Sequence, residues 1–227
     1  MRQHTIYNPP RSIGLDILSQ DEFLIVVNKP AGLLSVPGRG ADKTESMITR
    51  VQAEFPDALV VHRLDMATSG LMLLARGSGM QKRFFSMFRE REVTKRYEAI
   101  VEGVLTCEAG EVDFPLSADW PNRPRQKVDV AFGKKSITRF RLLGNINELP
   151  GRKNDATWRA SRMELEPVTG RTHQLRLHMA AIGHPILGDA LYGRRDSGER
   201  LMLHASRLAF VHPFSGDRIE VVSAAPF

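Results

Sequence analysis

The chain has 227 residues and a mass of 25.5 kDa, which suits one large domain or one domain with a small additional lobe. Hydrophobic residues make up 42% of it and it has one cysteine, so we expect a substantial core and exclude an internal disulfide framework or a multi-cysteine zinc site. There is neither a signal-peptide pattern nor an apolar run of about 18 residues, so we expect a soluble, cytoplasmic protein.

The basic excess, with a formal net charge of +6, is concentrated in one part of the chain. Residues 120–141 (WPNRPRQKVDVAFGKKSITRFR) contain seven lysines and arginines and one aspartate. A localised basic stretch is typical of a surface that binds a phosphate backbone. The alternative is a solvated basic loop.

In the first half of the chain, short apolar runs alternate with two helical patterns. Strands are predicted at Glu22–Asn28, at Val60–Val61 and at Leu71–Leu74. Asp42 and Glu45 resemble a capping box before a helix that has Met47, Ile48, Val51 and Phe55 on one face. A second helix begins with Ser78 and Gln81 as caps and turns Phe84, Phe85 and Phe88 toward the core.

The second half is richer in strands. They are predicted at Arg96–Leu105, Ile137–Leu143, Thr157–Leu165 and Arg218–Val222, and a helix is predicted at Thr172–Ile182, ending at Gly183. Short strands outnumber helices and do not alternate regularly with them. The pattern therefore predicts an α+β fold with a mixed or largely antiparallel sheet.

The common cofactor and hydrolase motifs are absent from the sequence. It has no GxGxxG, no P-loop and no GxSxG nucleophile elbow. His173 and His178 are five residues apart, about 140° from the same helix face, which makes a poor metal pair; capping, packing or RNA contact suits them better. We expect no cofactor, no bound nucleotide and no metal.

Two polar segments interrupt the apolar pattern. HRLDMATSG (His62–Gly70) places the carboxylate of Asp65 between two predicted strands, where the alternative interpretation is a salt-bridged turn. PVTGRTHQ (Pro167–Gln174) leads from a strand into a helix whose first N–H groups could bind an anion. The alternative there is an ordinary helix start with Thr172 as its N-cap.

These segments resemble the RluA-type family of RNA pseudouridine synthases. The resemblance extends over most of the chain in the order LIVVNKPAGLLSVPG (24–38), HRLDMATSGLMLLA (62–75), KRYEAIVEG (95–103), PVTGRTHQLRLHMAAIGHPILGDALYG (167–193) and LMLHASRLAFVHP (201–213). The resemblance implies a catalytic domain at residues 21–227, preceded by an N-terminal extension at residues 1–20. It also implies that this domain has a mixed sheet and two subdomains around a central cleft. We expect the chain to lack the S4 RNA-binding domain of longer members.

The segment Asp119–Val128 resembles a short member of the family that modifies both 23S ribosomal RNA and a tRNA anticodon stem-loop. The resemblance thus implies an isomerase that converts specific uridines in RNA stem-loops to pseudouridine. We expect RNA as its partner and expect it to be a monomer with no membrane association.

The resemblance also assigns roles to particular residues. Asp65 is the catalytic carboxylate, as nucleophile or as base, and Arg171 is its cationic partner. Tyr97 stacks on uracil or assists loss of the C5 proton, with a half-buried strand aromatic as the alternative. Arg63 enters the RNA where the target base has flipped out. The expected RNA-binding residues are Arg63, Arg39, Lys95, Arg123, Arg125, Lys127, Lys134 and Lys135.

Two other classes of function remain as alternatives. A non-catalytic RNA-binding protein that assists ribosome assembly would share the basic surface. A retaining glycosidase would need two carboxylates about 5 Å apart in one cleft, and only Asp65 falls in a motif.

Overall fold

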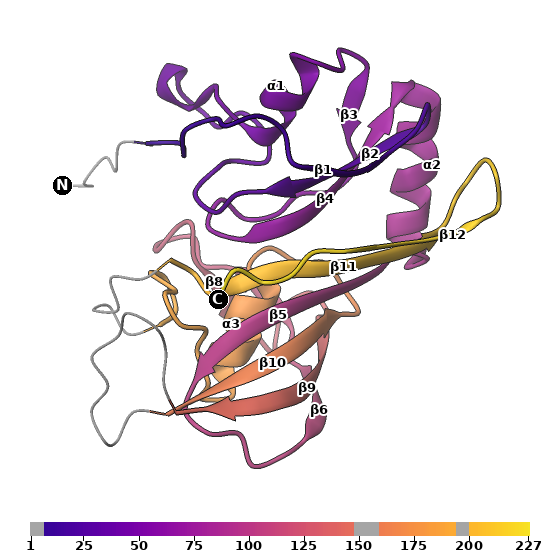
Figure 1. Ribbon diagram of the computed structural model, residues 1–227. Helices are drawn as coiled ribbons and strands as arrows, with labels where there is room; N and C mark the ends of the chain where they lie inside the picture. The colour runs from indigo at the N-terminus through magenta and orange to yellow at the C-terminus, as the bar shows by residue number, and fades with distance from the viewer. Residues whose placement is uncertain (1–6, 148–158, 194–199) are drawn as a thin grey trace. The chain divides into compact units, whose positions relative to one another are not determined.

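The computed structural model describes residues 7–147, 159–193 and 200–227, which belong to two compact units (Figure 1). Unit 1 is formed by residues up to Thr94 together with Ala205–Ala224, and unit 2 by Lys95–His204 with Ala225–Phe227. Each unit has its own strands, helices and buried side chains.

Unit 1 is a sheet with two helices. The strand order is β1 (Ile17–Gln20), β2 (Leu24–Lys29), β4 (Ser69–Arg76) and β11 (Leu203–Val211), while β3 (Ala58–Val60) pairs with β4 and β12 (Arg218–Val222) pairs with β11. β2 and β4 are buried along almost their whole length, which is why their sequences are continuously apolar rather than alternating. Ile25 and Val27 of β2 pack with Met72 and Leu74 of β4 in one core cluster.

The helices of unit 1 correct three sequence predictions. α1 (Met47–Gln52) begins at Ser46, which forms the capping box with Thr49, whereas Asp42 lies in a separate 3-10 turn, Ala41–Lys43. α2 (Gly77–Glu90) begins after Arg76, so Ser78 is not its cap. Its Phe84 is fully buried, but Phe85 is 50% exposed because the next residue along a helix points about 100° away.

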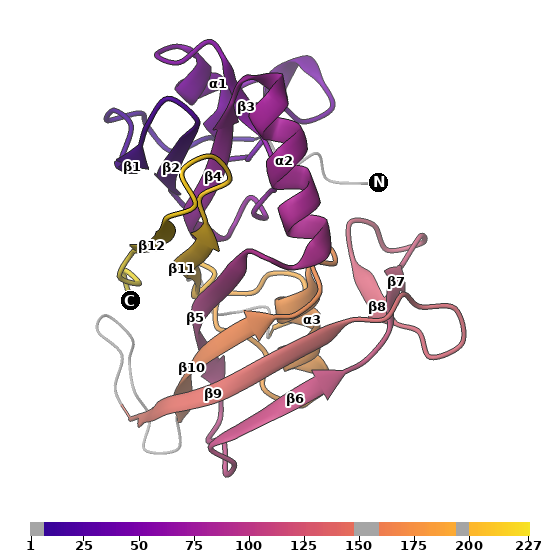
Figure 2. The same cartoon turned by 90° about the vertical axis from the view of Figure 1, so that its right-hand side faces the viewer.

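Unit 2 is an antiparallel sheet with a separate hairpin and one helix (Figure 2). The strand order is β5 (Thr94–Glu102), β10 (Ala160–Pro167), β9 (Ile137–Ile146) and β6 (Ala109–Asp113), and β7 (Leu116–Ala118) pairs with β8 (Gln126–Val128). α3 (Gln174–Ala181) packs against β8, β9 and β10. This mixture of helices and antiparallel strands confirms the predicted α+β class.

The boundaries of two predicted elements differ in unit 2. The helix predicted from Thr172 begins at Gln174, and its N-cap is His173 in the left-handed conformation (φ 54°), so Thr172 does not cap it. β10 begins at Ala160, and the predicted residues 157–158 lie outside the described ranges.

The N-terminal segment also contributes to the fold. Residues 17–20, assigned from sequence to an extension, form β1 and pair antiparallel with β2. Within the described part of the chain, none of the helices is long and apolar enough to cross a membrane.

Gly70 permits a close approach between β4 and β11 inside unit 1. Its φ is +111°, and a Cβ atom at this position would lie 2.4 Å from the carbonyl oxygen of Ala205. We expect Gly70→Ala to lower the free energy of unfolding by about 2 kcal/mol or more, through backbone strain and overpacking. Chemical denaturation of the purified protein measures this change.

Gly79 provides the matched control, because it lies inside α2 with no heavy atom within 4 Å of its would-be Cβ. Gly79→Ala should raise the stability by about 0.5–1 kcal/mol, since alanine loses less entropy than glycine in a helix. Equal effects of the two variants would contradict the close approach.

Candidate active site

Asp65 lies in unit 1 on the loop that joins β3 to β4. Its side chain is half-buried, while Arg63, two residues earlier, and Met66, one residue later, are exposed. The backbone N–H of Thr68 donates to the Asp65 carbonyl at 3.1 Å, which closes a turn directly after the aspartate. The loop therefore presents a carboxylate and a guanidinium near the surface of unit 1.

The backbone on both sides of Asp65 is fixed by hydrogen bonds to the preceding loop of the same unit. The hydroxyl of Ser35 donates to the Leu64 carbonyl at 2.7 Å and accepts from the Leu64 N–H at 3.1 Å. On the other side, the Gly32 N–H donates to the Met66 carbonyl at 2.8 Å. Because both neighbours are held, the direction in which the Asp65 side chain leaves the backbone is set by the fold.

Lys29 reinforces the second of these contacts from inside the protein. It is fully buried, and its ammonium donates to three carbonyls, those of Leu33 at 2.7 Å, Pro30 at 2.9 Å and Met66 at 3.2 Å. A buried ammonium is costly unless its donors are satisfied, and here each of the three reaches a carbonyl oxygen. This cation therefore ties the end of β2 to the Asp65 loop.

His62 anchors the start of the same loop. Its Nε2 accepts the backbone N–H of Leu73 at 2.9 Å, and its ring lies 4.7 Å from that of Phe88 on α2. The sequence analysis assigned no role to His62, Lys29 or Ser35. A lysine in an otherwise apolar strand was the signal for Lys29, because such a residue needs buried acceptors.

Tyr97 is placed in unit 2, on β5 opposite Leu165 of β10. Only 9% of its surface is exposed. Its position is fixed by a regular antiparallel ladder with β10, in which Ala99 pairs with Met163 in the same register.

Arg171 lies in the turn between β10 and α3, and its side chain is exposed. The turn is organised by Gln174, whose side-chain oxygen accepts from the Arg171 N–H at 3.0 Å and from the Thr169 hydroxyl at 2.7 Å. Gln174 is buried and its amide nitrogen donates to the carbonyl of Ile137 and the hydroxyl of Thr138. All hydrogen-bonding groups of this amide are used, so the turn is rigidly attached to β9.

The same hydrogen bonds continue to the hairpin of unit 2. The ring of His178 contacts the Thr138 hydroxyl through Nδ1 at 2.9 Å, and its Nε2 donates to the Phe114 carbonyl at 3.0 Å. Burial lowers the pKa of His178, which keeps the ring neutral as this pattern requires. His178 is therefore a packing residue, one of the roles expected from its sequence spacing.

Tyr192 links the hairpin to the start of α3. Its hydroxyl accepts the Gln126 N–H at 2.7 Å and contacts Nδ1 of His173 at 2.9 Å. Burial raises the pKa of Tyr192, so it stays protonated. Beside it, Arg176 forms a bidentate buried pair with Asp189 at 2.8 and 2.7 Å. Burial opposes ionisation of Asp189, but the hydrogen bond and charge of Arg176 outweigh it and lower its pKa.

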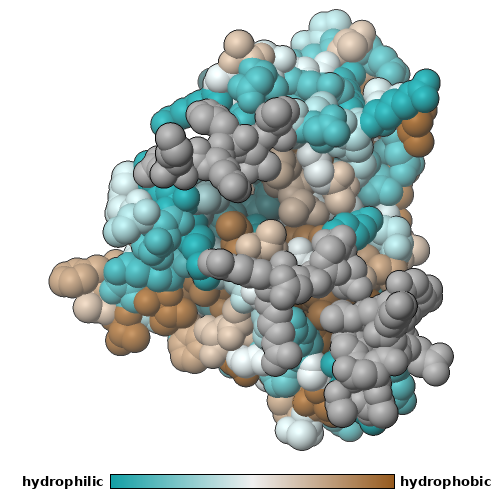
Figure 3. All heavy atoms as spheres, turned by 90° about the vertical axis from the view of Figure 1, so that its left-hand side faces the viewer, coloured by the Kyte–Doolittle hydropathy of each residue, from teal (hydrophilic) through white to brown (hydrophobic). Residues whose placement is uncertain are grey.

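The basic residues predicted to contact RNA are divided between the units. Arg63 and Arg39 are exposed on unit 1, and Lys95, half-buried, begins unit 2 on β5. Five more lie exposed on or beside the β7–β8 hairpin of unit 2: Arg123, Arg125, Lys127, Lys134 and Lys135. At the left-hand edge of Figure 3, hydrophilic atoms lie directly beside hydrophobic ones.

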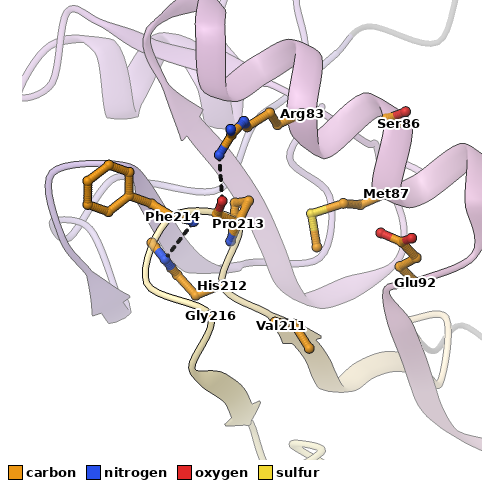
Figure 4. Close-up of a pocket in the computed structure, with 9 residues that line it drawn as sticks. All are labelled: Arg83, Ser86, Met87, Glu92, Val211, His212, Pro213, Phe214 and Gly216. Carbon is orange, nitrogen blue, oxygen red and sulfur yellow. Dashed lines mark hydrogen bonds between the residues drawn. The ribbon is translucent and has the colours of Figure 1, made fainter.

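A groove of about 720 Å³ in unit 1 contains none of the predicted site residues (Figure 4). It lies between α2 and the β11–β12 turn, with Arg83, Met87, His212 and Phe214 in its wall. Its polar groups are engaged locally, since Arg83 donates to the Pro213 carbonyl at 2.5 Å and Nδ1 of His212 accepts the N–H of Phe214 at 3.3 Å. These contacts suit a structural turn rather than a reaction centre.

The candidate residues are thus divided between the units: Asp65 and Arg63 belong to unit 1, and Tyr97 and Arg171 belong to unit 2. Among the described residues, there is no cluster of three or more His, Cys, Asp or Glu side chains that could hold a metal ion.

Comparison with known proteins identifies the family of the chain. Residues 23–181 match the model of the RNA pseudouridylate synthase family. The chain is 45% identical to the dual-specificity RNA pseudouridine synthase RluA of Haemophilus influenzae, covering 97% of this chain and 98% of that protein. It is 48% identical to the enzyme of the same name from Vibrio parahaemolyticus, over 92% and 82% of the two chains.

A solved structure has the same fold. Human RNA pseudouridylate synthase domain containing 1 superposes with a TM-score of 0.77 at 28% identity, covering 97% of this chain and 87% of that one.

Lys29 offers a test of the support beneath Asp65. We expect Lys29→Met to lower the free energy of unfolding by about 1–3 kcal/mol or more, because the buried Leu33 carbonyl and the part-buried hydrogen bonds to Pro30 and Met66 lose their donor. Thermal and chemical denaturation measure the change. Lys82→Met, at an exposed position of α2, is the control and should stay within about 0.5 kcal/mol of the wild type. An equally small effect at Lys29 would contradict its role.

Proposed function

This chain belongs to the RNA pseudouridylate synthase family, and on that premise we propose that it isomerises specific uridines in stem-loops of 23S ribosomal RNA and of a tRNA anticodon arm. The reaction detaches uracil from C1′ of the ribose, turns the base and rejoins it through C5. No atom is transferred to another molecule and nothing is oxidised, so the side chains of the protein suffice for it.

One observation supports ribosomal RNA and tRNA as the substrates. The similarity to dual-specificity RNA pseudouridine synthases spans 97% of the chain at 45% identity, so it includes the hairpin segment as well as the Asp65 loop. The catalytic domain is residues 21–227, with β1 added to its sheet. The protein acts in the cytoplasm as a monomer on RNA.

Asp65 supplies the catalytic carboxylate, either attacking C1′ or removing a proton from the sugar. Its support by Ser35, Gly32 and Lys29 favours this role, because a reacting group is effective only when its direction is fixed beforehand. Arg63 occupies the place of the flipped base in the RNA, and its exposed position on the same loop suits that task.

Arg171 and Tyr97 complete the catalytic set. The planar guanidinium of Arg171 keeps the carboxylate ionised and aimed while water is excluded. Gln174 favours this role, since it fixes the backbone of the turn while leaving the arginine side chain exposed. Tyr97 stacks against uracil, and its hydroxyl assists loss of the C5 proton. The basic residues Arg39, Lys95, Arg123, Arg125, Lys127, Lys134 and Lys135 bind phosphates.

The substrate assignment is tested by mapping pseudouridines in ribosomal RNA and tRNA from cells with and without the gene for this chain. We expect at least one site in each RNA class to disappear in the deletion strain and to return with a plasmid copy. Loss in one class alone would contradict dual specificity, and an unchanged map would contradict the proposed function.

The role of Asp65 predicts that Asp65→Asn abolishes pseudouridine formation while changing RNA affinity only a few-fold. Removing a reacting carboxylate costs on the order of 10⁴-fold in turnover, whereas an isosteric amide preserves the loop. Tritium release from C5-labelled uridine measures turnover, and fluorescence anisotropy measures binding. Asp57→Asn, at a surface ion pair of unit 1, is the control and should keep normal turnover. Substantial turnover by Asp65→Asn would exclude a catalytic role.

The pairing of Arg171 with the carboxylate predicts that Arg171→Lys lowers turnover by on the order of 10²-fold even though the charge is kept. A guanidinium makes two parallel hydrogen bonds to a carboxylate, and an ammonium acts as a point charge. The matched control is Arg139→Lys on β9, whose guanidinium pairs with Glu111 at the surface. Near-normal turnover in Arg171→Lys would mean that the partner of the carboxylate lies elsewhere.

A further inference from the structure

The hairpin of unit 2 carries exposed apolar side chains that the function described so far does not use. The hairpin lobe, residues 114–135, consists of β7, β8 and the loops around them. Trp120 is 67% exposed, Val130 85% and Phe132 89%. Large apolar side chains at such exposure are unfavourable in water, so their presence on one small lobe indicates a surface that binds another molecule.

The loop that carries Trp120 is held in a defined shape. Asp119 and Arg125 are joined by a backbone hydrogen bond of 3.0 Å, and the Asn122 side chain donates to the Asp119 carboxylate at 3.0 Å. The guanidinium carbon of Arg123 lies 3.2 Å from the centre of the Trp120 ring. The indole is thus presented by a closed loop with a cation on one face.

The loop that carries Phe132 is equally constrained. The carboxylate of Asp129 accepts the Phe132 N–H at 3.0 Å and the Ser117 hydroxyl at 2.9 Å. These hydrogen bonds lower the pKa of Asp129, that from Phe132 most of all. A Cβ atom on Gly133 would lie 2.3 Å from the Asp129 carbonyl oxygen, so the turn is too tight for any larger residue. A rigid turn therefore holds the Phe132 ring in solvent.

The charges around these rings indicate the chemistry of the partner. The lobe has five basic residues, Arg123, Arg125, Lys127, Lys134 and Lys135, and two acidic ones, Asp119 and Asp129. Both aspartates accept hydrogen bonds from their own loops. Lys127 pairs with Asp129 at 3.5 Å, and the lobe keeps an excess of three positive charges. Aromatic rings interleaved with excess cations are the pattern of surfaces that bind single-stranded nucleic acid, where bases stack and phosphates pair with cations.

Resting on the proposed function, we propose that Trp120 and Phe132 form a stacking surface for unpaired bases of the RNA loop outside the flipped uridine. Paired RNA hides its base faces, so this surface selects stem-loops over duplexes, and the neighbouring cations bind both alike. In Figure 3, hydrophobic and hydrophilic atoms lie side by side at the left-hand edge, consistent with mixed chemistry on one surface.

The test compares Trp120→Ala/Phe132→Ala with the wild type in binding to a synthetic anticodon stem-loop and to a fully paired RNA duplex of equal length. Losing a base stack on an aromatic ring weakens binding by about 5- to 150-fold. We therefore expect stem-loop affinity to fall at least about tenfold, duplex affinity to change less than about threefold, and the salt dependence to keep its slope. Arg123→Gln/Arg125→Gln should instead weaken both RNAs and flatten the slope.

Phe214→Ala is the matched control, because Phe214 has the same 67% exposure as Trp120 and lies in unit 1. It should bind both RNAs like the wild type. Tryptophan emission gives a direct readout in a Trp158→Phe background, where Trp120 is the remaining indole. The stem-loop should quench it strongly and the duplex weakly.

The outcomes separate this inference from the proposed function. If the wild type forms pseudouridine but Trp120→Ala/Phe132→Ala binds the stem-loop normally, the stacking surface is wrong and the proposed function stands. Equal weakening for stem-loop and duplex also overturns it, because a duplex offers no free base faces. A wild type that forms no pseudouridine in either RNA class overturns both.

Discussion

The geometry of the Asp65 loop depends on one buried ammonium. Lys29 leaves the end of β2, enters the interior of unit 1 and donates to three carbonyls, one of which belongs to Met66 beside the aspartate. A lysine in this position is tolerated only while each donor has an acceptor, so the loop and the strand stabilise one another. The carboxylate that we propose to be catalytic is thus placed by the same interaction that satisfies the interior charge.

In unit 2, neutral side chains hold the turn that carries Arg171. Gln174 holds the Arg171 turn, and the hydroxyl of Thr138 and the ring of His178 continue the hydrogen bonds to Phe114, at the base of the hairpin lobe. The Arg171 side chain also donates from Nε to the Lys135 carbonyl at 3.4 Å. The buried amide restricts the backbone and leaves the guanidinium available to an anion. The Arg171 turn, proposed to be catalytic, and the lobe proposed to bind RNA therefore share one hydrogen-bond network.

The sequence predicted the positions of strands and helices well where apolar residues recur regularly. It predicted the residues at which these elements begin and end less well. β12 lies at the predicted residues, and β2 and β9 lie within a few positions of them. The caps were wrong at α1, α2 and α3, because Ser, Thr and Asp occur at several nearby positions and only the backbone conformation selects among them. Phe85 was wrongly assigned to the core, since three phenylalanines in five residues span more than one helix face.

The sequence by itself determined the α+β class, the family and the identities of the candidate residues, because these follow from local period and from motifs contiguous in the chain. The supports of those residues were decided only by the tertiary structure. Ser35 and Leu64 are 29 residues apart, and Lys29 and Met66 are 37 apart. Contacts between residues so far apart in the chain produce no repeating pattern in the sequence. They exist because a buried donor must find whichever acceptor the fold brings within reach.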